Sequence, residues 1–216
     1  MEKPVLLSEQ ALKRLPRYLW YLKELQRDHC EYVTAPAVAR HLGLNEVQVR
    51  KELSCMSSIP GRPRMGFLVD NLVENMENYL GYRNVDEAVL VGVGSLGKAL
   101  LGYDGFDQCG IHILAAFDHN EALDGLSFHG KSLFSARKIT DLCRRLNVKI
   151  GIIAVPKEQA QIVCDQLIAG GVRAIWNFAA VQLRVPEHVL VRNEDLASSL
   201  ALLTHQLQDK LMREAE

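Results

Sequence analysis

The chain has 216 residues, of which 48% are hydrophobic and 24% charged, and its formal net charge is -1. This composition excludes a disordered or collagen-like chain, and the length predicts one domain or two modest ones. The sequence shows no apolar stretch long enough to cross a membrane, no secretory signal, and five scattered cysteines without a C-x-x-C pair. We therefore expect a cytoplasmic protein with no membrane segment, no metal site and no disulfide framework.

Positive charge gathers in the first third of the chain, where residues 1–65 carry 11 Lys and Arg against 7 Asp and Glu. A net charge near zero argues against a protein that coats nucleic acid, but it is compatible with a local basic face. Ser8 is the expected N-cap of a first helix. Leucines recur along one face of this helix at Leu12, Leu15, Leu19 and Leu22.

Two short helices are predicted next. Thr34 is the expected N-cap of the first, Gly43 ends it because glycine accepts a positive φ, and Asn45 caps the second. Two short helices joined by a three-residue turn are typical of a helix-turn-helix.

The second of these helices has an outer face suited to DNA. Val49 and Leu53 stand one turn apart and are expected to face the core, which turns the polar residues near them outward. Residues 57–66, rich in Pro, Gly and Arg, are expected to form the wing of a winged helix. The predicted DNA contacts are Gln48, Arg50, Lys51, Arg62 and Arg64. A helical bundle that binds no DNA and a solvated hairpin explain the same patterns and stay open.

A further helix is expected at residues 69–80, and a nucleotide-binding fold is predicted beyond residue 85. Residues 88–91 form a short apolar strand, and the motif G-x-G-x-x-G follows at residues 92–97 where a helix starts. The first glycine permits a tight turn, the second lets the backbone approach a pyrophosphate, and the third lets helix and strand pack closely. The N-terminus of the helix offers unpaired N–H groups to the anion.

The second strand of this fold, residues 111–117, ends in Asp118, 21 residues after the last glycine of the motif. A carboxylate at this place can accept hydrogen bonds from the ribose of NAD and repels the 2′-phosphate of NADP. Helices and strands then alternate at 136–146, 148–155, 157–169 and 172–175, which predicts a doubly wound parallel sheet. The predicted cofactor contacts are Gly92, Val93, Gly94, Ser95, Leu96, Gly97, Asp118, Val155, Pro156 and Phe178.

The sequence predicts no catalytic residue at this site, because no Ser/His, Cys/His or His/Asp arrangement accompanies it. About 130 residues leave no room for a separate substrate domain, so a cofactor sensor is favoured over a dehydrogenase. A Rossmann-like domain that keeps the glycine turn only for packing is the alternative.

The last predicted helix, 195–212, carries a leucine stripe that needs a partner surface: Leu196, Leu200, Leu203, Leu207 and Leu211. Packing on its own domain is one explanation. Pairing with a second subunit is favoured, because helix-turn-helix proteins usually read two-fold operators as dimers. We therefore expect a DNA-binding domain at 1–84, a cofactor domain at 85–193 and a dimerisation helix at 194–216.

The assembled motifs resemble those of the Rex family of redox-sensing transcriptional repressors over nearly the full length. The resemblance rests on the order and spacing of Lys13-Arg-Leu-Pro-Arg-Tyr18, Gln48-Val-Arg-Lys-Glu-Leu-Ser54, Val91-Gly-Val-Gly-Ser-Leu-Gly97, Ala115-Ala-Phe-Asp118 and Trp176-Asn-Phe-Ala179. It implies a winged helix joined to a Rossmann domain and a homodimer with exchanged C-terminal helices. It also implies NADH and NAD+ as cofactors and a palindromic double-stranded operator, which is released when NADH closes the two Rossmann domains on each other. By the same resemblance, Tyr103 belongs to the nicotinamide pocket.

The chain departs from the family pattern at several positions. Trp20 stands where the family commonly has an arginine that in relatives can pair with the acid corresponding to Asp195. Ala180 replaces a typical proline, the wing contains Pro63, and Ser54-Cys-Met-Ser57 replaces Ser-Tyr-Phe-Gly. The alternatives are a divergent paralogue that binds DNA without redox sensing and, less favoured, a small NAD-dependent oxidoreductase.

Overall fold

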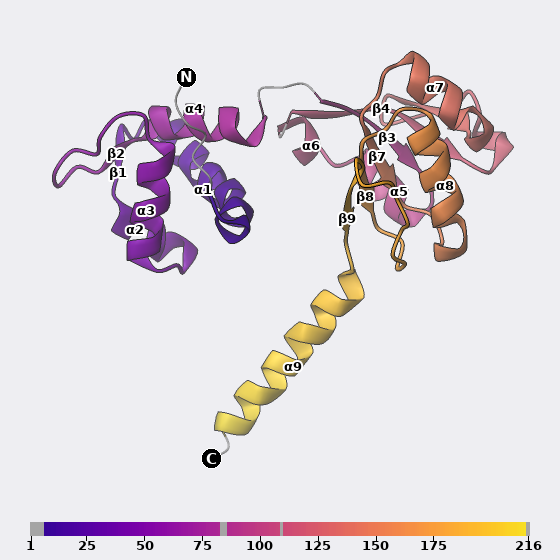
Figure 1. The fold of residues 1–216 in the computed structure, drawn as a ribbon. Coiled ribbons are helices and arrows are strands. Elements are labelled where there is room, and N and C mark those ends of the chain that lie inside the picture. Colours follow the sequence, from indigo (N-terminus) through magenta and orange to yellow (C-terminus); the bar gives the residue numbers. More distant parts are fainter. Residues whose placement is uncertain (1–6, 83–85, 109, 215–216) are drawn as a thin grey trace. The chain divides into compact units, whose positions relative to one another are not determined.

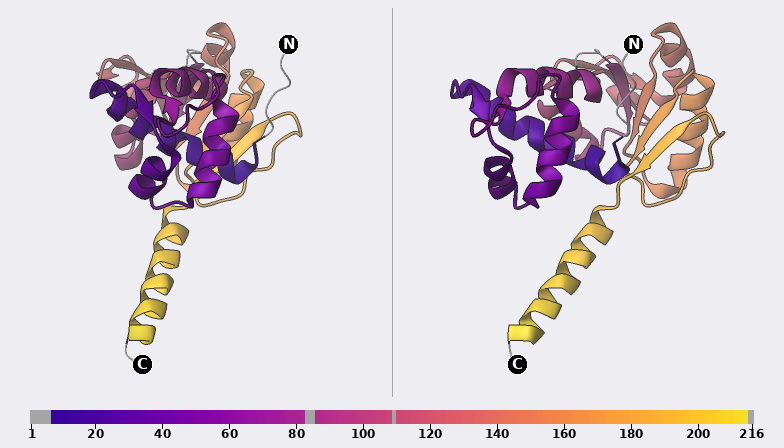
Figure 2. Two further views of the ribbon diagram at one scale, coloured as in Figure 1. Left: turned by 90° about the vertical axis from the view of Figure 1, so that its left-hand side faces the viewer. Right: turned by 60° about the vertical axis from the view of Figure 1, so that its left-hand side comes forward.

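A computed structural model of the chain describes residues 7–82, 86–108 and 110–214. The chain divides into two compact units, Met1–Asn84 and Val85–Glu216 (Figures 1 and 2). The first unit contains α1 (Glu9–Arg27), β1 (Tyr32–Val33), α2 (Ala35–Leu42), α3 (Glu46–Met56), β2 (Phe67–Leu68) and α4 (Val69–Leu80). This order of four helices and a two-stranded antiparallel sheet is that of a winged helix, as predicted.

The helices of the first unit begin at the predicted capping residues. The hydroxyl of Ser8 accepts a hydrogen bond from the backbone N–H of Ala11, and Thr34 and Asn45 cap α2 and α3 in the same way. Gly43 has a φ of 64° and ends α2. Side-chain caps matter here because the first N–H groups of a helix otherwise lack partners. The turn between α2 and α3 is therefore fixed by local chemistry.

The core of the first unit lies between α1, α3 and α4, where Leu15, Leu22, Val49 and Leu53 are fully buried. Leu12, the first of the four leucines along the helix, is 38% exposed and lies outside this core. The inward stripe of α1 instead runs through residues 11, 15, 18 and 22, a spacing of three and four residues that places Ala11 on the core side.

The second unit is built on a seven-stranded sheet in the order β5-β6-β4-β3-β7-β8-β9. All neighbouring strands are parallel except the β5–β6 pair. The strands are β3 (Asp86–Val91), β4 (Ile111–Asp118), β5 (Ser127–Phe128), β6 (Lys131–Ser135), β7 (Ile150–Ile153), β8 (Ala174–Asn177) and β9 (Leu190–Asn193). The helices are α5 (Ser95–Leu101), α6 (Gly105–Gln108), α7 (Ile139–Arg145), α8 (Lys157–Ala169) and α9 (Leu196–Glu214).

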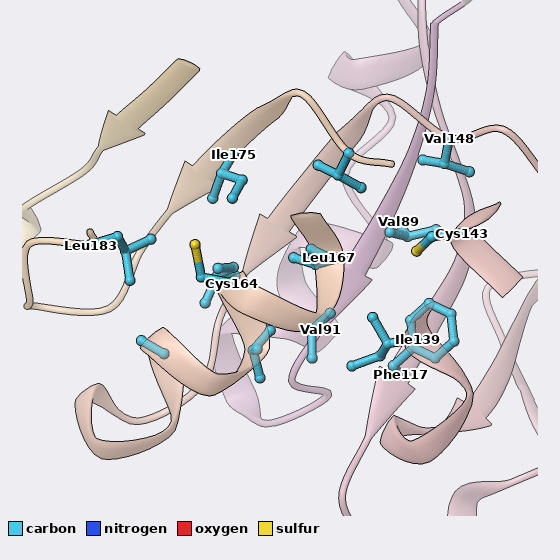
Figure 3. Close-up of a cluster of buried hydrophobic side chains, with 14 of the residues drawn as sticks. Val89, Val91, Phe117, Ile139, Cys143, Val148, Cys164, Leu167, Ile175 and Leu183 are labelled. Carbon is cyan, nitrogen blue, oxygen red and sulfur yellow. The ribbon is translucent and has the colours of Figure 1, made fainter. Parts of the chain in front are cut away.

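Both faces of this sheet are covered, which confirms the doubly wound Rossmann-like fold. On one face, side chains of α7 and α8, among them Ile139, Cys164 and Leu167, pack on Val89 and Val91 of β3 (Figure 3). On the other face α5 and α6 pack on the side chains that point the opposite way from the same strands. The strand predicted at 172–175 begins two residues later, because Val172 still bonds to the end of α8.

Two cysteines of this core are chemically protected. Burial raises the pKa of the Cys143 thiol, and of Cys164, to about 11. Because the thiolate is the reactive form, alkylation of the native protein at pH 8 is expected to spare both and to label the exposed Cys30. Peptide mass spectrometry with and without denaturant measures this. Equal labelling of Cys30 and Cys143 under native conditions would contradict the described packing.

Four leucines of the predicted stripe on α9 are exposed in the single chain. Leu200, Leu203, Leu207 and Leu211 are each more than half accessible, at 64%, 60%, 54% and 55%. In the described residues these four leucines therefore do not pack on their own unit, which was the alternative prediction. Among the described residues, no helix is both long and apolar enough to span a membrane.

Candidate DNA-binding and cofactor sites

The outer surface of α3 presents the predicted polar side chains. With Val49 and Leu53 buried, Arg50 and Lys51 are exposed and Gln48 is partly exposed. The guanidinium of Arg50 pairs with the carboxylate of Glu46 one turn earlier, at 2.5 Å. Basic groups therefore lie on the solvent side of the second helix of the helix-turn-helix, which is the side that enters a DNA groove.

The wing is a loop closed by a backbone bridge. Arg62 and Gly66 form an antiparallel bridge, with the Arg62 N–H 2.8 Å from the Gly66 oxygen. Gly66 has a φ of 92°, and a side chain there would collide with the backbone oxygen of Val33. Arg64, between them, has a φ of 65° in the left-handed region. The positive φ values and the close approach to Val33 tie the turn of the wing to glycine at position 66.

The wing and α3 enclose a shared basic cavity. A cavity of about 610 Å³ is lined by Arg50, Arg62 and Arg64 together with Thr34 and Ser54. The guanidinium carbon of Arg62 lies 5.2 Å from the centre of the Tyr32 ring, within reach of a cation–π interaction. Three predicted DNA contacts are thus brought together. Gln48 and Lys51 lie outside the lining of this cavity.

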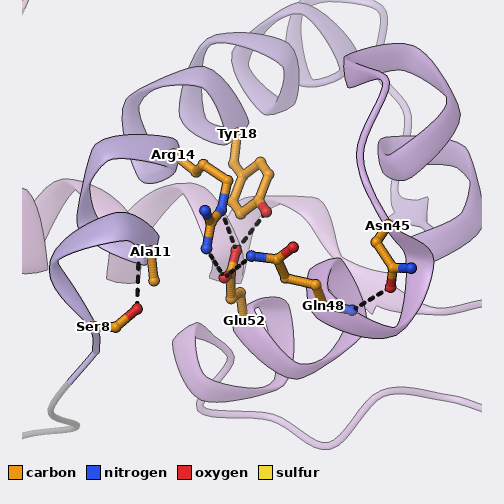
Figure 4. A network of polar contacts seen from close by, with 7 residues as sticks. All are labelled: Ser8, Ala11, Arg14, Tyr18, Asn45, Gln48 and Glu52. Atoms are coloured by element: carbon orange, nitrogen blue, oxygen red, sulfur yellow. Dashed lines mark hydrogen bonds and ion pairs between the residues drawn. The ribbon is translucent and has the colours of Figure 1, made fainter.

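A buried ionic network joins α3 to α1 (Figure 4). The carboxylate of Glu52 accepts hydrogen bonds from the guanidinium of Arg14 at 2.5 Å and from the hydroxyl of Tyr18, also at 2.5 Å. It also accepts a hydrogen bond from the side-chain nitrogen of Gln48 at 3.3 Å. This role of Arg14 was not predicted from the sequence. Its position one turn before Tyr18, beside the buried stripe, was the available signal.

Each member of the network is ionised or neutral for a physical reason. Burial alone would raise the pKa of Glu52, but hydrogen bonds from Arg14, Tyr18 and Gln48 outweigh it and hold that pKa below its usual value. Burial and the neighbouring carboxylate raise the pKa of Tyr18, so its hydroxyl stays a donor. The hydrogen bond to Glu52 raises the pKa of Arg14. Arg14 and Glu52 therefore form a charged pair, a guanidinium bound to a carboxylate, and the Tyr18 hydroxyl is neutral.

The glycine motif forms the turn between β3 and α5. Gly92 has a φ of 100°, and a Cβ there would lie 2.5 Å from the backbone oxygen of Ala154. A Cβ on Gly97 would collide with the backbone oxygen of Gly92. Around Gly94, by contrast, no atom lies within 4 Å of an added Cβ. The first and third glycines are therefore required by packing, and the second borders open space.

Asp118 stands at the end of β4 and ties that strand to the glycine turn. It is 8% exposed, and its carboxylate accepts hydrogen bonds from the backbone N–H groups of Val93 at 2.7 Å and Asn120 at 2.9 Å. The ring of His119 lies 3.1 Å from the same carboxylate. A carboxylate fixed in this way faces the space outside the carboxyl ends of the strands, where Rossmann-type folds bind ligands.

A cavity of about 640 Å³ opens beside this carboxylate and contains six of the predicted cofactor residues: Gly92, Val93, Gly94, Asp118, Val155 and Pro156. Lys98, His119 and Glu121 line it as well and were not predicted from the sequence. A second cavity of about 410 Å³, toward α8, shares Gly92, Asp118 and Pro156 with the first. The size and position of the two cavities suit an extended ligand.

The other predicted cofactor residues lie outside the lining of these two cavities. Ser95 and Leu96 are exposed at the start of α5, and Gly97 is buried below them. Tyr103 and Phe178 are the two ends of a row of aromatic rings. Phe106 and Trp176 lie between them. The ring centres are 5.1 Å apart for Tyr103 and Phe106, 5.7 Å for Phe106 and Trp176, and 4.6 Å for Trp176 and Phe178.

A buried amide organises the loop after β8. The side-chain nitrogen of Asn177 donates to the backbone oxygens of Ala179 and Val181 and to the side-chain oxygen of Asn193 on β9. Its own oxygen accepts from the N–H of Ala179. The loop that carries Phe178 is therefore held by hydrogen bonds, with alanine at position 180.

Comparison with known proteins matches both units. Residues 85–181 match the family model "CoA binding domain", and residues 7–54 match the family model "Putative DNA-binding protein N-terminus". The redox-sensing transcriptional repressor Rex of Bacteroides fragilis is 38% identical over 92% of this chain and 90% of its own length. That of Clostridium beijerinckii is 37% identical over 97% of this chain and 99% of its own length.

Solved structures of a Rex-family repressor, RSP, have the same fold. RSP in complex with beta-NAD+ and operator DNA superimposes with a TM-score of 0.88 at 29% identity, covering 98% of this chain and 97% of RSP. RSP in complex with beta-NADH gives 0.85 at 29% identity, covering 98% and 100%. The sequence relatives, the fold and the two candidate sites agree, and the chain belongs to the Rex family of redox-sensing transcriptional repressors.

Proposed function

We propose that the chain is a homodimeric repressor that binds a palindromic operator and releases it when NADH binds. The observation that carries the proposal is the presence, in one chain, of a winged helix with a basic outer face and a Rossmann unit with an open glycine turn. Its relatives are named redox-sensing transcriptional repressors, and RSP has been solved with operator DNA, with NAD+ and with NADH. A repressor has to reach chromosomal DNA, so a cytoplasmic location is part of the proposal.

In this proposal residues 1–84 bind DNA. The side chains that read or grip the duplex are Gln48, Arg50, Lys51, Arg62 and Arg64. Their support is the exposure of α3 and the shared cavity of Arg50, Arg62 and Arg64. Arginine and glutamine bond to base edges, and lysine and the wing arginines neutralise phosphates.

Residues 85–193 bind the cofactor in the proposal, and the residues present fit a dinucleotide. The open space at Gly94 and the N-terminus of α5, which carries Ser95, Leu96 and Gly97, suit a pyrophosphate. The carboxylate of Asp118 suits ribose hydroxyls and disfavours a 2′-phosphate. We assign Val93, Val155 and Pro156 to the walls of the site, and Tyr103 and Phe178 to its nicotinamide end. The protein binds the cofactor without turning it over.

Residues 194–216 supply the dimer contact in the proposal. The exposed leucines of α9 cost free energy in water, and a second copy that buries them recovers it. Exchange of this helix between subunits gives the two DNA-binding units the two-fold relation that a palindrome requires.

A divergent repressor without redox sensing is the second candidate, and two observations favour it. Trp20 is 54% exposed and offers no charge to an acid. Asp195 bonds instead to the backbone and hydroxyl of Ser198 at the start of α9, and these bonds lower its pKa. The arginine of the polar pair proposed for relatives is therefore absent here, and the acid that remains, Asp195, bonds to Ser198.

Calorimetric titration with NADH, NAD+ and NADPH separately distinguishes the two candidates. Binding of NADH much tighter than NAD+, with weak NADPH, is the result expected of a redox sensor. Equal affinity for NADH and NAD+, or no binding, contradicts sensing and leaves the divergent repressor. Hydride transfer to or from a simple alcohol or carbonyl would contradict the assignment as a non-enzyme.

Replacement of Arg50 and Lys51 by alanine is expected to abolish specific duplex binding while NADH binding is unchanged. Loss of the Arg50 base contact costs about 1 to 3 kcal/mol, or roughly 5- to 150-fold in affinity, and loss of the Lys51 phosphate contact lowers affinity further for every duplex. Fluorescence anisotropy with a duplex selected by the wild-type protein measures this. The control removes two exposed charges from the other unit, Arg145→Ala with Lys149→Ala. Retained specific binding in the Arg50/Lys51 variant would exclude these side chains as the reading residues.

A further inference from the structure

The helix α3, the second helix of the helix-turn-helix, carries a buried charged side chain. Neither DNA contact nor cofactor binding, as proposed above, uses this side chain. Glu52 is 6% exposed, and Arg14 and Tyr18 both bond to its carboxylate. Both partners belong to α1, so the carboxylate is held from outside its own helix. With its pKa lowered by these bonds, Glu52 is a fixed negative charge behind the DNA-facing surface of α3.

This charge determines how the amide of Gln48 is turned. Gln48 stands one turn before Glu52 on α3, and its Nε2 donates to Glu52 Oε1 at 3.3 Å. Figure 4 shows the amide nitrogen directed at Glu52 and the amide oxygen directed away from it. The reverse orientation would place the amide oxygen against a carboxylate oxygen, and two acceptors without a shared proton repel each other. Gln48 therefore presents its oxygen, an acceptor, on the partly exposed side.

We propose that Glu52 sets the hydrogen-bonding direction of Gln48, so that the outward amide oxygen favours a base that carries an amino group. The second N–H of the amide stays available to a neighbouring acceptor such as adenine N7. The inference rests on the proposed function, because it requires Gln48 to lie in a major groove. Adenine N6 and cytosine N4 are the amino donors of that groove, whereas guanine O6 and thymine O4 are acceptors. Glu52 touches no base and is a positioning residue, which Arg14 and Tyr18 hold in place.

Binding of the full-length protein to matched duplexes tests the proposal. The wild-type protein selects an operator from random duplexes, and the base read by Gln48 is the one at which Gln48→Ala loses discrimination. We expect the wild type to prefer adenine or cytosine there by about tenfold. Glu52→Gln keeps the shape but removes the charge, and it is expected to reduce this preference to about twofold. The preference at bases read by Arg50 is expected to stay unchanged.

The double variant separates positioning from simple support of the fold. In the Gln48→Ala background, Glu52→Gln is expected to change discrimination no further, because its effect acts through the amide. An equal loss of affinity for all duplexes, an effect that persists without Gln48, or no discrimination lost in Gln48→Ala would each overturn the proposal. If the wild type selects no duplex at all, the proposed function fails first and this inference with it.

A measurement on the free wild-type protein covers the case in which Glu52→Gln does not fold. The side-chain amide signals of Gln48, assigned by comparison with Gln48→Ala, are expected to show a rigid group in NMR relaxation. They are also expected to shift in acid as the Glu52 carboxylate becomes protonated. A freely rotating amide that is insensitive to acid would overturn the proposal without any DNA.

Discussion

Replacement of Gly97 by alanine is expected to destabilise the Val85–Glu216 unit by about 3 kcal/mol and to abolish cofactor binding. The added methyl group would collide with the backbone oxygen of Gly92. Relief of this collision requires a shift of the backbone of the turn or of α5, and either shift disrupts other contacts. The turn that holds Gly94 open would have to shift with it. Urea unfolding followed by hydrogen exchange and mass spectrometry measures the two units separately, and calorimetry measures NADH.

Gly94→Ala is the matched control for this prediction. A Cβ at Gly94 meets no atom within 4 Å, and its φ of -72° suits any residue. We expect the stability of the unit to change by less than about 0.5 kcal/mol, whereas NADH affinity falls because the methyl group occupies the space of the pyrophosphate. Unchanged NADH affinity in Gly94→Ala would place the ligand elsewhere. Unchanged stability in Gly97→Ala would contradict the described packing of α5 on the turn.

Replacement of Arg14 by methionine is expected to destabilise the winged-helix unit by about 3 kcal/mol at pH 7. The change leaves the buried carboxylate of Glu52 without its charged partner, and uncompensated buried charges cost about this much. Arg27→Met, which removes an exposed guanidinium from the same helix, is the control and is expected to cost less than about 0.5 kcal/mol. Hydrogen exchange of peptides from α1 and α3 measures both variants.

The penalty in Arg14→Met is also expected to depend on pH. In the wild type the pKa of Glu52 lies below its unfolded value, so its stabilisation is present above about pH 4.5 and is lost in more acidic solution. In the variant, burial dominates and raises that pKa, so protonation relieves the penalty as the pH falls. The stability difference between the two proteins should therefore shrink from pH 7 toward pH 4. A difference that is constant over this range would show that Arg14 acts through packing alone.

Local chemistry explains why much of the fold could be predicted from sequence. Ser8, Thr34 and Asn45 act within three residues along the chain, so helix starts are visible without tertiary information. The same holds for the turn between β3 and α5, because its positive φ at Gly92 and the close approach of Gly97 to Gly92 lie within six residues. Asp118 could be placed because parallel strands bring their carboxyl ends to one edge of the sheet.

Features that depend on distant partners were not visible in the sequence. The two-residue strands β1 and β2 are too short for an alternating pattern and exist only because they pair with each other. The strand β5, which pairs with β6 in a hairpin, is equally short, and the edge strand β9 is largely exposed. The bond between Arg14 and Glu52 spans 38 residues of sequence, and only packing of α1 on α3 creates it. Tyr103 and Phe178 were named separately, and the rings of Phe106 and Trp176 that link them were not foreseen.

The ion pair between Arg50 and Glu46 has a consequence for the salt dependence of operator binding. Both side chains are exposed, at 62% and 47%, so an i,i+4 pair of this kind contributes only about 0.3 to 0.5 kcal/mol and exchanges readily. When the guanidinium moves to a nucleic acid, it leaves the carboxylate of Glu46 unpaired near the phosphates, and these negative charges repel each other. Salt screens this repulsion, which partly offsets the weakening of binding by salt. The slope of log affinity against log salt should therefore be shallower than the value of about 0.9 per phosphate contacted.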